Sequence, residues 1–151
     1  MDAIVEQSLP EQELRSVGLY VEDDDATAYL FEKALLEAGA SLRLFRVTDG
    51  EQGLAFLLRQ GAYQDAPALD LVIFDLNLPK MSGFELLATI RQTEAHKKTP
   101  VVVFSSSTLA DSRERALALG ADLFCTKSND WNGFVETAKA IHSLLPGRAT
   151  V

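Results

Sequence analysis

The chain has 151 residues with a formal net charge of -8, and its composition is 47% hydrophobic and 24% charged. This length favours one domain with a buried core, and the acidic balance excludes nucleic-acid binding through a broad basic surface. Cys125 is the sole cysteine, so an intramolecular disulfide is not possible, which fits a reducing compartment. No apolar stretch reaches the ~20 residues of a membrane span, and the acidic N-terminus is unlike a signal peptide. We therefore predict a cytoplasmic protein.

Apolar runs with strand character alternate along the chain with amphipathic helical patterns. This alternation predicts a parallel sheet covered by helices on both faces. Right-handed crossovers favour an α/β fold of the flavodoxin-like type, a doubly wound (βα)5 arrangement whose five-stranded parallel sheet has the order 2-1-3-4-5. We assign an N-terminal extension to residues 1–15, one domain to residues 16–146 and a C-terminal tail to residues 147–151. The strands are expected at residues 17–21, 42–47, 69–75, 100–105 and 123–127.

Capping signals mark where several helices begin. Asp24 or Asp25 can cap the first helix, which Gly39 ends. Asn129 or Asp130 can cap the last helix. Two further helices are expected to begin at segments of capping-box form, in which a Ser or Thr precedes a Glu by three positions: Thr48-Asp49-Gly50-Glu51 and Ser82-Gly83-Phe84-Glu85.

Polar side chains follow four of the predicted strands at the point where each strand ends. Asp75 ends the apolar third strand, and Glu22 and Asp23 follow the first strand. Ser105 ends the fourth strand, and Lys127 ends the fifth. Because the carboxyl ends of parallel strands meet at one edge of the sheet, where ligands collect in open α/β folds, we expect these side chains to lie close together.

Three carboxylates at one edge repel one another unless a cation neutralises them. Oxygen ligands without a nearby histidine or thiol favour Mg²⁺, with Mn²⁺ as an alternative, over zinc. We expect Asp23 and Asp75 to be direct ligands and Glu22 to act largely through water. The backbone carbonyl of Asn77 is the further ligand that the loop after Asp75 would supply.

The remaining groups suit a phosphoryl group. Lys127 supplies a mobile positive charge for phosphate oxygens, and Ser105 supplies a hydroxyl donor. Asp75 would then be a carboxylate nucleophile that becomes an acyl phosphate, without the need for a general base. Neither His96 nor His142 is placed for catalysis, and we expect both histidines at the surface.

With these residues in place, the chain resembles the receiver domain of two-component response regulators, the CheY-like superfamily. The long loop before the third strand and the run at residues 75–80 most resemble the single-domain regulators that pair with phytochrome-type histidine kinases. The motifs that carry the resemblance are Val21-Glu22-Asp23-Asp24, Phe74-Asp75-Leu76-Asn77-Leu78-Pro79-Lys80-Met81-Ser82-Gly83, Pro100-Val101-Val102-Val103-Phe104-Ser105 and Gly120-Ala121-Asp122-Leu123-Phe124-Cys125-Thr126-Lys127.

The resemblance implies a role for each matching position and a partner for the protein. Asp75 would accept a phosphoryl group from the phosphohistidine of a histidine kinase. The output would be a changed surface on the fourth helix, fifth strand and fifth helix, which could also form a homodimer. The other implied roles are an acidic pocket at Glu22 and Asp23, a hydroxyl at Ser105 that swings toward the phosphate, a switch aromatic at Phe124 that turns inward when this hydroxyl moves, and a phosphate-pairing lysine at Lys127.

One position departs from the family pattern. The family usually has a proline after the lysine, often joined by a cis bond, and this chain has Ser128. A cis bond without proline costs ~3 kcal/mol. Either the bond is trans and the loop takes another route, or strain is stored beside the site.

Three alternatives to a phosphoacceptor stay open at this stage. A flavin-binding module of the same fold is disfavoured because the acidic residues 22–25 would repel a phosphate. A phosphatase with an aspartyl nucleophile favours a second acid two residues after the nucleophile, where this chain has Asn77. A pseudo-receiver that acts only through protein contacts would not need the complete set of acids, hydroxyl and lysine. This alternative stays open because Ser128 stands where the family usually has proline.

Overall fold

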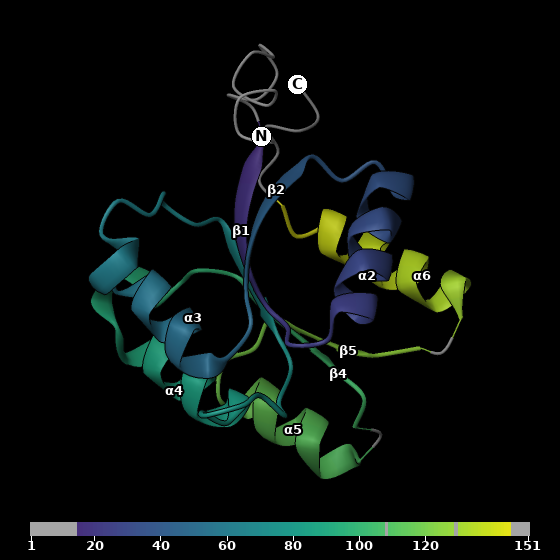
Figure 1. Cartoon of the computed structure of the whole chain (residues 1–151). Coiled ribbons are helices and arrows are strands. Elements are labelled where there is room, and N and C mark those ends of the chain that lie inside the picture. The colour runs from purple at the N-terminus through teal and green to yellow at the C-terminus, as the bar shows by residue number, and fades with distance from the viewer. Residues whose placement is uncertain (1–14, 108, 129, 146–151) are drawn as a thin grey trace.

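The predicted parallel sheet is present, with strand order β2-β1-β3-β4-β5, in a computed structural model that describes residues 15–107, 109–128 and 130–145 (Figure 1). The predicted flavodoxin-like topology is therefore confirmed. Most of the predicted extension and tail lies outside the described residues. The strands are β1 (Ser16–Val21), β2 (Leu42–Val47), β3 (Leu71–Phe74), β4 (Val101–Ser105) and β5 (Leu123–Thr126).

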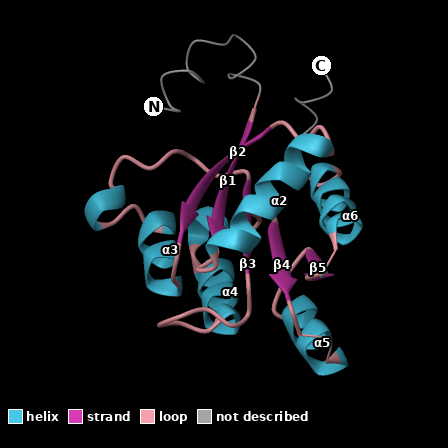
Figure 2. Ribbon diagram, turned by 45° about the vertical axis from the view of Figure 1, so that its right-hand side comes forward, coloured by secondary structure: helices cyan, strands magenta, loops and turns pink. Residues whose placement is uncertain are grey.

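Helices cover both faces of this sheet. They are α2 (Asp25–Glu37), α3 (Gly50–Leu57), α4 (Gly83–Gln92), α5 (Ala110–Ala118) and α6 (Trp131–His142), with short 3-10 turns at Gly61–Tyr63 and Glu94–His96. The helices α3, α4 and α5 pack on one face, and α2 and α6 lie side by side on the other (Figure 2). Among the described residues, no helix has the length and apolar character that crossing a membrane requires.

The central strand β3 is buried on both faces, as its apolar sequence predicts. Its four residues are all 0% exposed, because α3, α4 and α5 cover one side and α2 and α6 cover the other. A strand with helices on both faces has no polar side, so nearly every side chain must be apolar. The chain therefore emerges at Asp75 from the most enclosed part of the sheet.

The helix caps agree with the sequence at three of the four places for which we made a prediction. Asp24 caps α2 and Asp130 caps α6. The box of Ser82 and Glu85 at α4 is present in both directions. At α3 the predicted Thr48 box is wrong, because Asp49 is the cap and accepts from Gln52 N at 2.8 Å.

The α5 helix is the least anchored of the helices by apolar contacts. Ala116 is its one buried residue, and the cap position, Leu109, makes no side-chain hydrogen bond. The sequence pattern predicts that this helix opens at Thr108, which lies outside the described residues. Two arginines hold α5 instead: the Arg113 guanidinium donates to the Phe124 carbonyl at 3.2 Å, and Arg115 lies 4.0 Å from the ring centroid of Phe84.

Candidate functional site

The carboxyl ends of three strands bring two acids and one lysine into contact. In the sheet register Val21 of β1 lies beside Phe74 of β3, so the residues that follow, Glu22 and Asp75, emerge side by side. The Lys127 ammonium, directly after β5, lies 2.8 Å from Glu22 Oε1 and 2.9 Å from Asp75 Oδ2. The structure therefore unites Glu22, Asp75 and Lys127, which are separated by up to 105 positions in the sequence.

Each of the two carboxylates is fixed through both of its oxygens. The second oxygen of Glu22 accepts from the backbone N–H of Asp24 at 3.1 Å. The second oxygen of Asp75 accepts from the backbone N–H of Asn77 at 3.2 Å. Since a carboxylate with both oxygens bound cannot rotate freely, these contacts orient the Asp75 oxygens before any ligand arrives.

The lysine balances one of the two negative charges. Glu22 is 2% exposed and Asp75 is 8% exposed, so neither charge is fully hydrated. Burial by itself lowers the pKa of Lys127, but its hydrogen bonds to Glu22 and Asp75 and their charges outweigh burial and raise the pKa above its ordinary value. Lys127 therefore stays protonated at neutral pH, and the cluster keeps one net negative charge.

The remaining candidate ligands are differently placed. Asp23 is exposed, whereas Glu22 beside it is buried. All of the candidate donors at Glu22, Asp23, Asp75 and Asn77 are oxygens, and this donor set fits a hard divalent cation. Within the described ranges no three His, Cys, Asp or Glu side chains gather as a formed metal site, and the Lys127 ammonium contacts both Glu22 and Asp75. A cation at this position would therefore compete with Lys127 for the two buried carboxylates.

Ser105 and Phe124 lie on neighbouring strands next to this cluster. Ser105 is 0% exposed, and its hydroxyl oxygen accepts from Ser107 N at 3.2 Å. The Ser105 carbonyl accepts from Lys127 N at 2.7 Å, which fixes the lysine backbone at the end of β4. Across the described residues, no hydrogen bond joins the Ser105 hydroxyl to Asp75 or Lys127. Phe124, the predicted switch aromatic, is already buried, at 5% exposure.

The Lys127–Ser128 peptide bond is trans, since none of the peptide bonds among the described residues is cis. This settles the choice that the sequence left open in favour of a re-routed loop. The Ser128 hydroxyl donates to Asp130 Oδ1 at 3.0 Å and accepts from Asp130 N at 3.1 Å. The loop lies so close to α6 that a Cβ on Gly133 would collide with the Ser128 side chain. The requirement for glycine at position 133 is not visible without this packing.

Sequence reasoning also missed two residues that shape the loops around the site. Gly83 allows α4 to begin against the backbone of Asp75, because a Cβ there would collide with the Asp75 carbonyl oxygen. Arg46 of β2 donates from Nε to the Glu22 carbonyl oxygen at 2.9 Å. The run at residues 42–47 contains two arginines, Arg43 and Arg46, and the sequence gives no signal that only the second contacts the loop after β1.

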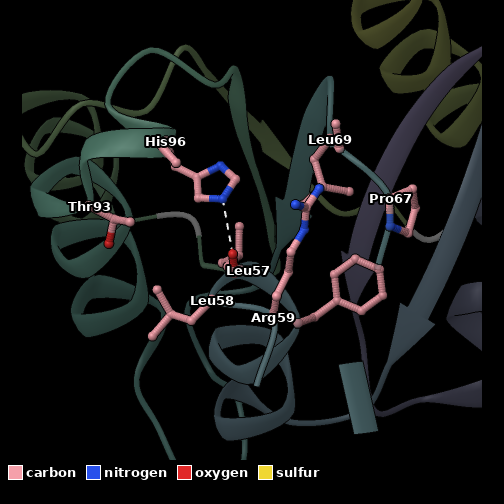
Figure 3. Close-up of a pocket in the computed structure, with 10 residues that line it drawn as sticks. Leu57, Leu58, Arg59, Pro67, Leu69, Thr93 and His96 are labelled. Atoms are coloured by element: carbon pink, nitrogen blue, oxygen red, sulfur yellow. Dashed lines mark hydrogen bonds between the residues drawn. The ribbon is translucent and has the colours of Figure 1, made fainter. Parts of the chain in front are cut away.

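Both histidines were expected at the surface, and both are instead half-buried. His96 contacts the C-terminal end of α3: its Nε2 lies 3.1 Å from the carbonyl oxygen of Leu57, the last residue of that helix (Figure 3). It lines a pocket of about 360 Å³ together with Arg59 and Leu69. Because Leu69 precedes β3 and Asp75 follows it, this pocket lies at the opposite end of the strand from the acidic cluster.

The helical spacing of Trp131 with Phe134, Val135 and Ala138 predicts a core or half-buried position for its side chain, and the structure corrects this. It is 41% exposed, because it is the first residue of α6 and lies outside the buried stripe. The buried residues of this helix are Phe134, Thr137, Ala138 and Ile141.

Comparison with known proteins gives a consistent result. The family model described as "Response regulator receiver domain" matches residues 19–139. The response regulator Rcp1 of Synechocystis sp. (strain ATCC 27184 / PCC 6803 / Kazusa) is 35% identical over 127 residues, which cover 84% of this chain and 86% of the relative. The crystal structure of the phosphorylated cyanobacterial phytochrome response regulator RcpA has a TM-score of 0.80 at 32% identity and covers 87% of this chain and 94% of that one. The Mn²⁺-bound form of Rcp1 has a TM-score of 0.79 at 34% identity, with coverage of 87% and 99%.

Proposed function

We propose that this chain, which belongs to the response regulator receiver family, is a phosphoacceptor of a two-component system and carries the phosphoryl group on Asp75. The observation that supports this proposal most directly is the Lys127 ammonium, held 2.8 and 2.9 Å from the carboxylates of Glu22 and Asp75. The carboxylate of Asp75 is oriented by hydrogen bonds to both of its oxygens, and it stands at the carboxyl ends of parallel strands, where ligands collect in open α/β folds.

In the proposed reaction an Asp75 oxygen attacks the phosphorus of a phosphohistidine. The new O–P bond forms as the N–P bond breaks, and the electron pair of that bond leaves with the imidazole, which takes a proton from solvent. Asp75 needs no base because a carboxylate is already ionised at neutral pH. Once Asp75 is an acyl phosphate, the negative charge lies on the phosphoryl oxygens instead of on the carboxylate, so Lys127 can pair with a phosphoryl oxygen.

A divalent cation is part of the proposal, with Mg²⁺ or Mn²⁺ as the ion. The oxygens of Glu22, Asp23, Asp75 and the Asn77 carbonyl would hold it. Such an ion neutralises the negative charge that develops on the transferring phosphoryl group. The related protein Rcp1 has a Mn²⁺-bound form, and this supports the choice of a hard divalent cation.

The output step is proposed to run from Ser105 to the α5–β5–α6 face. The buried Ser105 hydroxyl would turn from Ser107 N toward the phosphoryl group, and Phe124 on the adjacent strand would respond. Phe124 is held by Arg113 of α5 through a hydrogen bond to its carbonyl, so movement at this strand is transmitted to α5. A partner, or a second copy of the chain in a homodimer, would read the changed surface.

The kinase partner is proposed to be of the phytochrome type. The support for this partner is the likeness to Rcp1 and to the phytochrome response regulator RcpA. The exchange would take place in the cytoplasm, and the receiver would assist both its own phosphorylation and its dephosphorylation.

The deciding experiment is incubation of the full chain with Mg²⁺ and acetyl phosphate, followed by intact mass spectrometry. We expect one phosphate adduct that disappears in Asp75→Asn and persists in the matched control Asp65→Asn, an exposed acid before β3. Addition of a chelator should abolish the adduct in the wild-type chain. If no adduct forms with acetyl phosphate or with a phosphorylated histidine kinase, the phosphoacceptor proposal fails and a pseudo-receiver becomes the better assignment.

A further inference from the structure

One guanidinium holds the chain on both sides of Asp23. Arg46, the penultimate residue of β2, lies beside Tyr20 in the register with β1. Its Nε donates to the Glu22 carbonyl oxygen at 2.9 Å, and its Nη1 lies 2.9 Å from Asp25 Oδ1. The backbone just before Asp23 and the first side chain after the α2 cap are thus tied to the same group.

These two contacts differ in strength. The Asp25 carboxylate is 93% exposed, so solvent weakens its ion pair with Arg46. The hydrogen bond to the Glu22 carbonyl is partly buried and charge-assisted, and it is the stronger restraint on the loop. The third guanidinium nitrogen, Nη2, is buried without a hydrogen-bond partner among the described residues. Buried donors are normally paired, so the fold bears a cost in keeping this group beside the acidic loop.

We propose that Arg46 is a positioning residue for the divalent-cation site. It holds the backbone of residues 22–25 in place, so that the exposed Asp23 carboxylate is presented to the ion. This inference rests on the proposed function. Arg46 is not itself a ligand, because it is a cation. It acts through the Glu22 carbonyl, which fixes the backbone one residue before Asp23.

Removing Arg46 has two opposite effects on cation affinity. Loss of a positive charge near the acids strengthens cation binding, but screening by water and salt limits this effect at an exposed edge. Loss of a group that orients a ligand typically weakens metal affinity by about 10–100-fold. We therefore expect Arg46→Met to raise the Kd for Mg²⁺ and Mn²⁺ about tenfold.

The test is calorimetric titration of the full chain with Mg²⁺ or Mn²⁺ alone, without a phosphodonor. Arg46→Gln removes the charge but keeps an N–H donor for the Glu22 carbonyl, so its Kd should lie between those of wild type and Arg46→Met. The matched control is Arg43→Met on the same strand, which removes the same charge from a side chain that lies 4.7 Å from the Phe45 ring centroid. We expect this control to bind the ion no more weakly than wild type.

The outcomes separate this inference from the proposed function. A wild-type chain that binds neither ion overturns the proposed metal and this inference with it. A wild-type chain that binds the ion, together with an Arg46→Met variant that binds it equally or more tightly, overturns the role of Arg46 alone. Thermal unfolding with EDTA checks that each variant is folded at the titration temperature, and Arg46→Gln decides the matter if Arg46→Met is not folded.

Discussion

The two edges of the sheet use the same chemical groups in opposite ways. At the amino-terminal edge, the carboxylates of Asp70 and Asp122 accept from the backbone N–H groups of Val17 and Val101, each the first or second residue of its strand. At the carboxyl-terminal edge, Glu22 and Asp75 also accept from backbone N–H groups, but their other oxygens share the ammonium of Lys127. Contacts to the backbone persist, whereas contacts to an ammonium can be exchanged for a metal ion or a phosphoryl group.

The cation at each edge shows the same contrast. Arg91 of α4 donates to the carbonyl oxygens of Gly120, His96 and Thr99 and also pairs with Asp122 at 3.0 Å. Its planar fork is suited to a fixed set of acceptors, and Lys127 is a point charge on a flexible stem. The amino-terminal edge is therefore built to hold loops in place, and the carboxyl-terminal edge is built to change partners.

The largest effect is expected from Lys127→Met. Without the ammonium, Glu22 and Asp75 remain buried as unpaired acids, so the free energy of unfolding at pH 7 should fall by about 3 kcal/mol. Acetyl phosphate labelling should become undetectable. Chemical denaturation with and without Mg²⁺ checks the first point, and Mg²⁺ should restore more stability in the variant than in wild type. Lys80→Met is the matched control, since Lys80 lies in the same region but is 61% exposed. An unchanged denaturation midpoint for Lys127→Met would show that the two edges do not differ as described.

Arg91→Met should give a smaller loss that is confined to stability. Three loop carbonyls lose their donor, and we expect a decrease of about 2 kcal/mol in the free energy of unfolding. Arg91→Lys should recover only part of this loss because one ammonium cannot reach all of the acceptors. The extent of phosphorylation, measured by intact mass well below the unfolding temperature, should equal that of wild type. Reduced phosphorylation of the folded variant would contradict the separation of the two edges.

Tyr20→Phe should stabilise the protein and flatten its response to alkaline pH. The Tyr20 hydroxyl is buried without a hydrogen-bond partner among the described residues, so its removal should add about 1 kcal/mol at pH 7. Burial, and then the charge of Glu22, raise the pKa of Tyr20 above its ordinary value. Tyrosine therefore ionises near pH ~10 in the unfolded chain but stays neutral in the folded one, and stability falls as pH rises above that value.

Lys127 also contributes to the loss of stability at alkaline pH, but through a different group and cause. Its raised pKa gives stability that is fully present below the ordinary lysine pKa and is lost as pH rises through the higher folded value. Denaturation midpoints from pH 7 to pH 11 should therefore decline less steeply in Tyr20→Phe than in wild type, with a residual decline from Lys127. Identical slopes for the two proteins would refute the assignment to Tyr20.

The smallest effect is expected from Arg59→Gly at the amino-terminal edge. Arg59 has a φ of 55°, in the left-handed region that favours glycine. Glycine relieves this strain in the folded chain, but it also raises the conformational entropy of the unfolded chain, which lowers stability. The first effect is the larger, and we expect a gain of about 0.5 kcal/mol in the free energy of unfolding. Lys80→Gly, with a φ of 69°, is the counterpart at the other edge and should gain less, because its side chain also lies 3.7 Å from Asp49. Differential scanning calorimetry of the two variants side by side would detect a reversal of this order.

The sequence alone determined the alternation of strands and helices, favoured one sheet order among a few, and supplied the residues of the acidic edge. The apolar run before Asp75 can only be a strand covered on both faces, and alternation with helices leaves few sheet orders. Once the order is known, Glu22, Asp75 and Lys127 must emerge at one edge. These are consequences of hydrophobic periodicity, which is local and therefore readable from the chain.

Tertiary structure decided which atoms meet, because such contacts depend on packing between distant segments. Only the packed chain shows Lys127 between the two buried acids, the trans loop at Ser128 pressed against Gly133, and Trp131 turned away from the core. The same is true of Arg46, which in the sequence is simply one of two arginines in a strand. Its contact with the Glu22 carbonyl exists because β2 pairs with β1 in one particular register, and no periodic pattern encodes where a guanidinium on that strand will end.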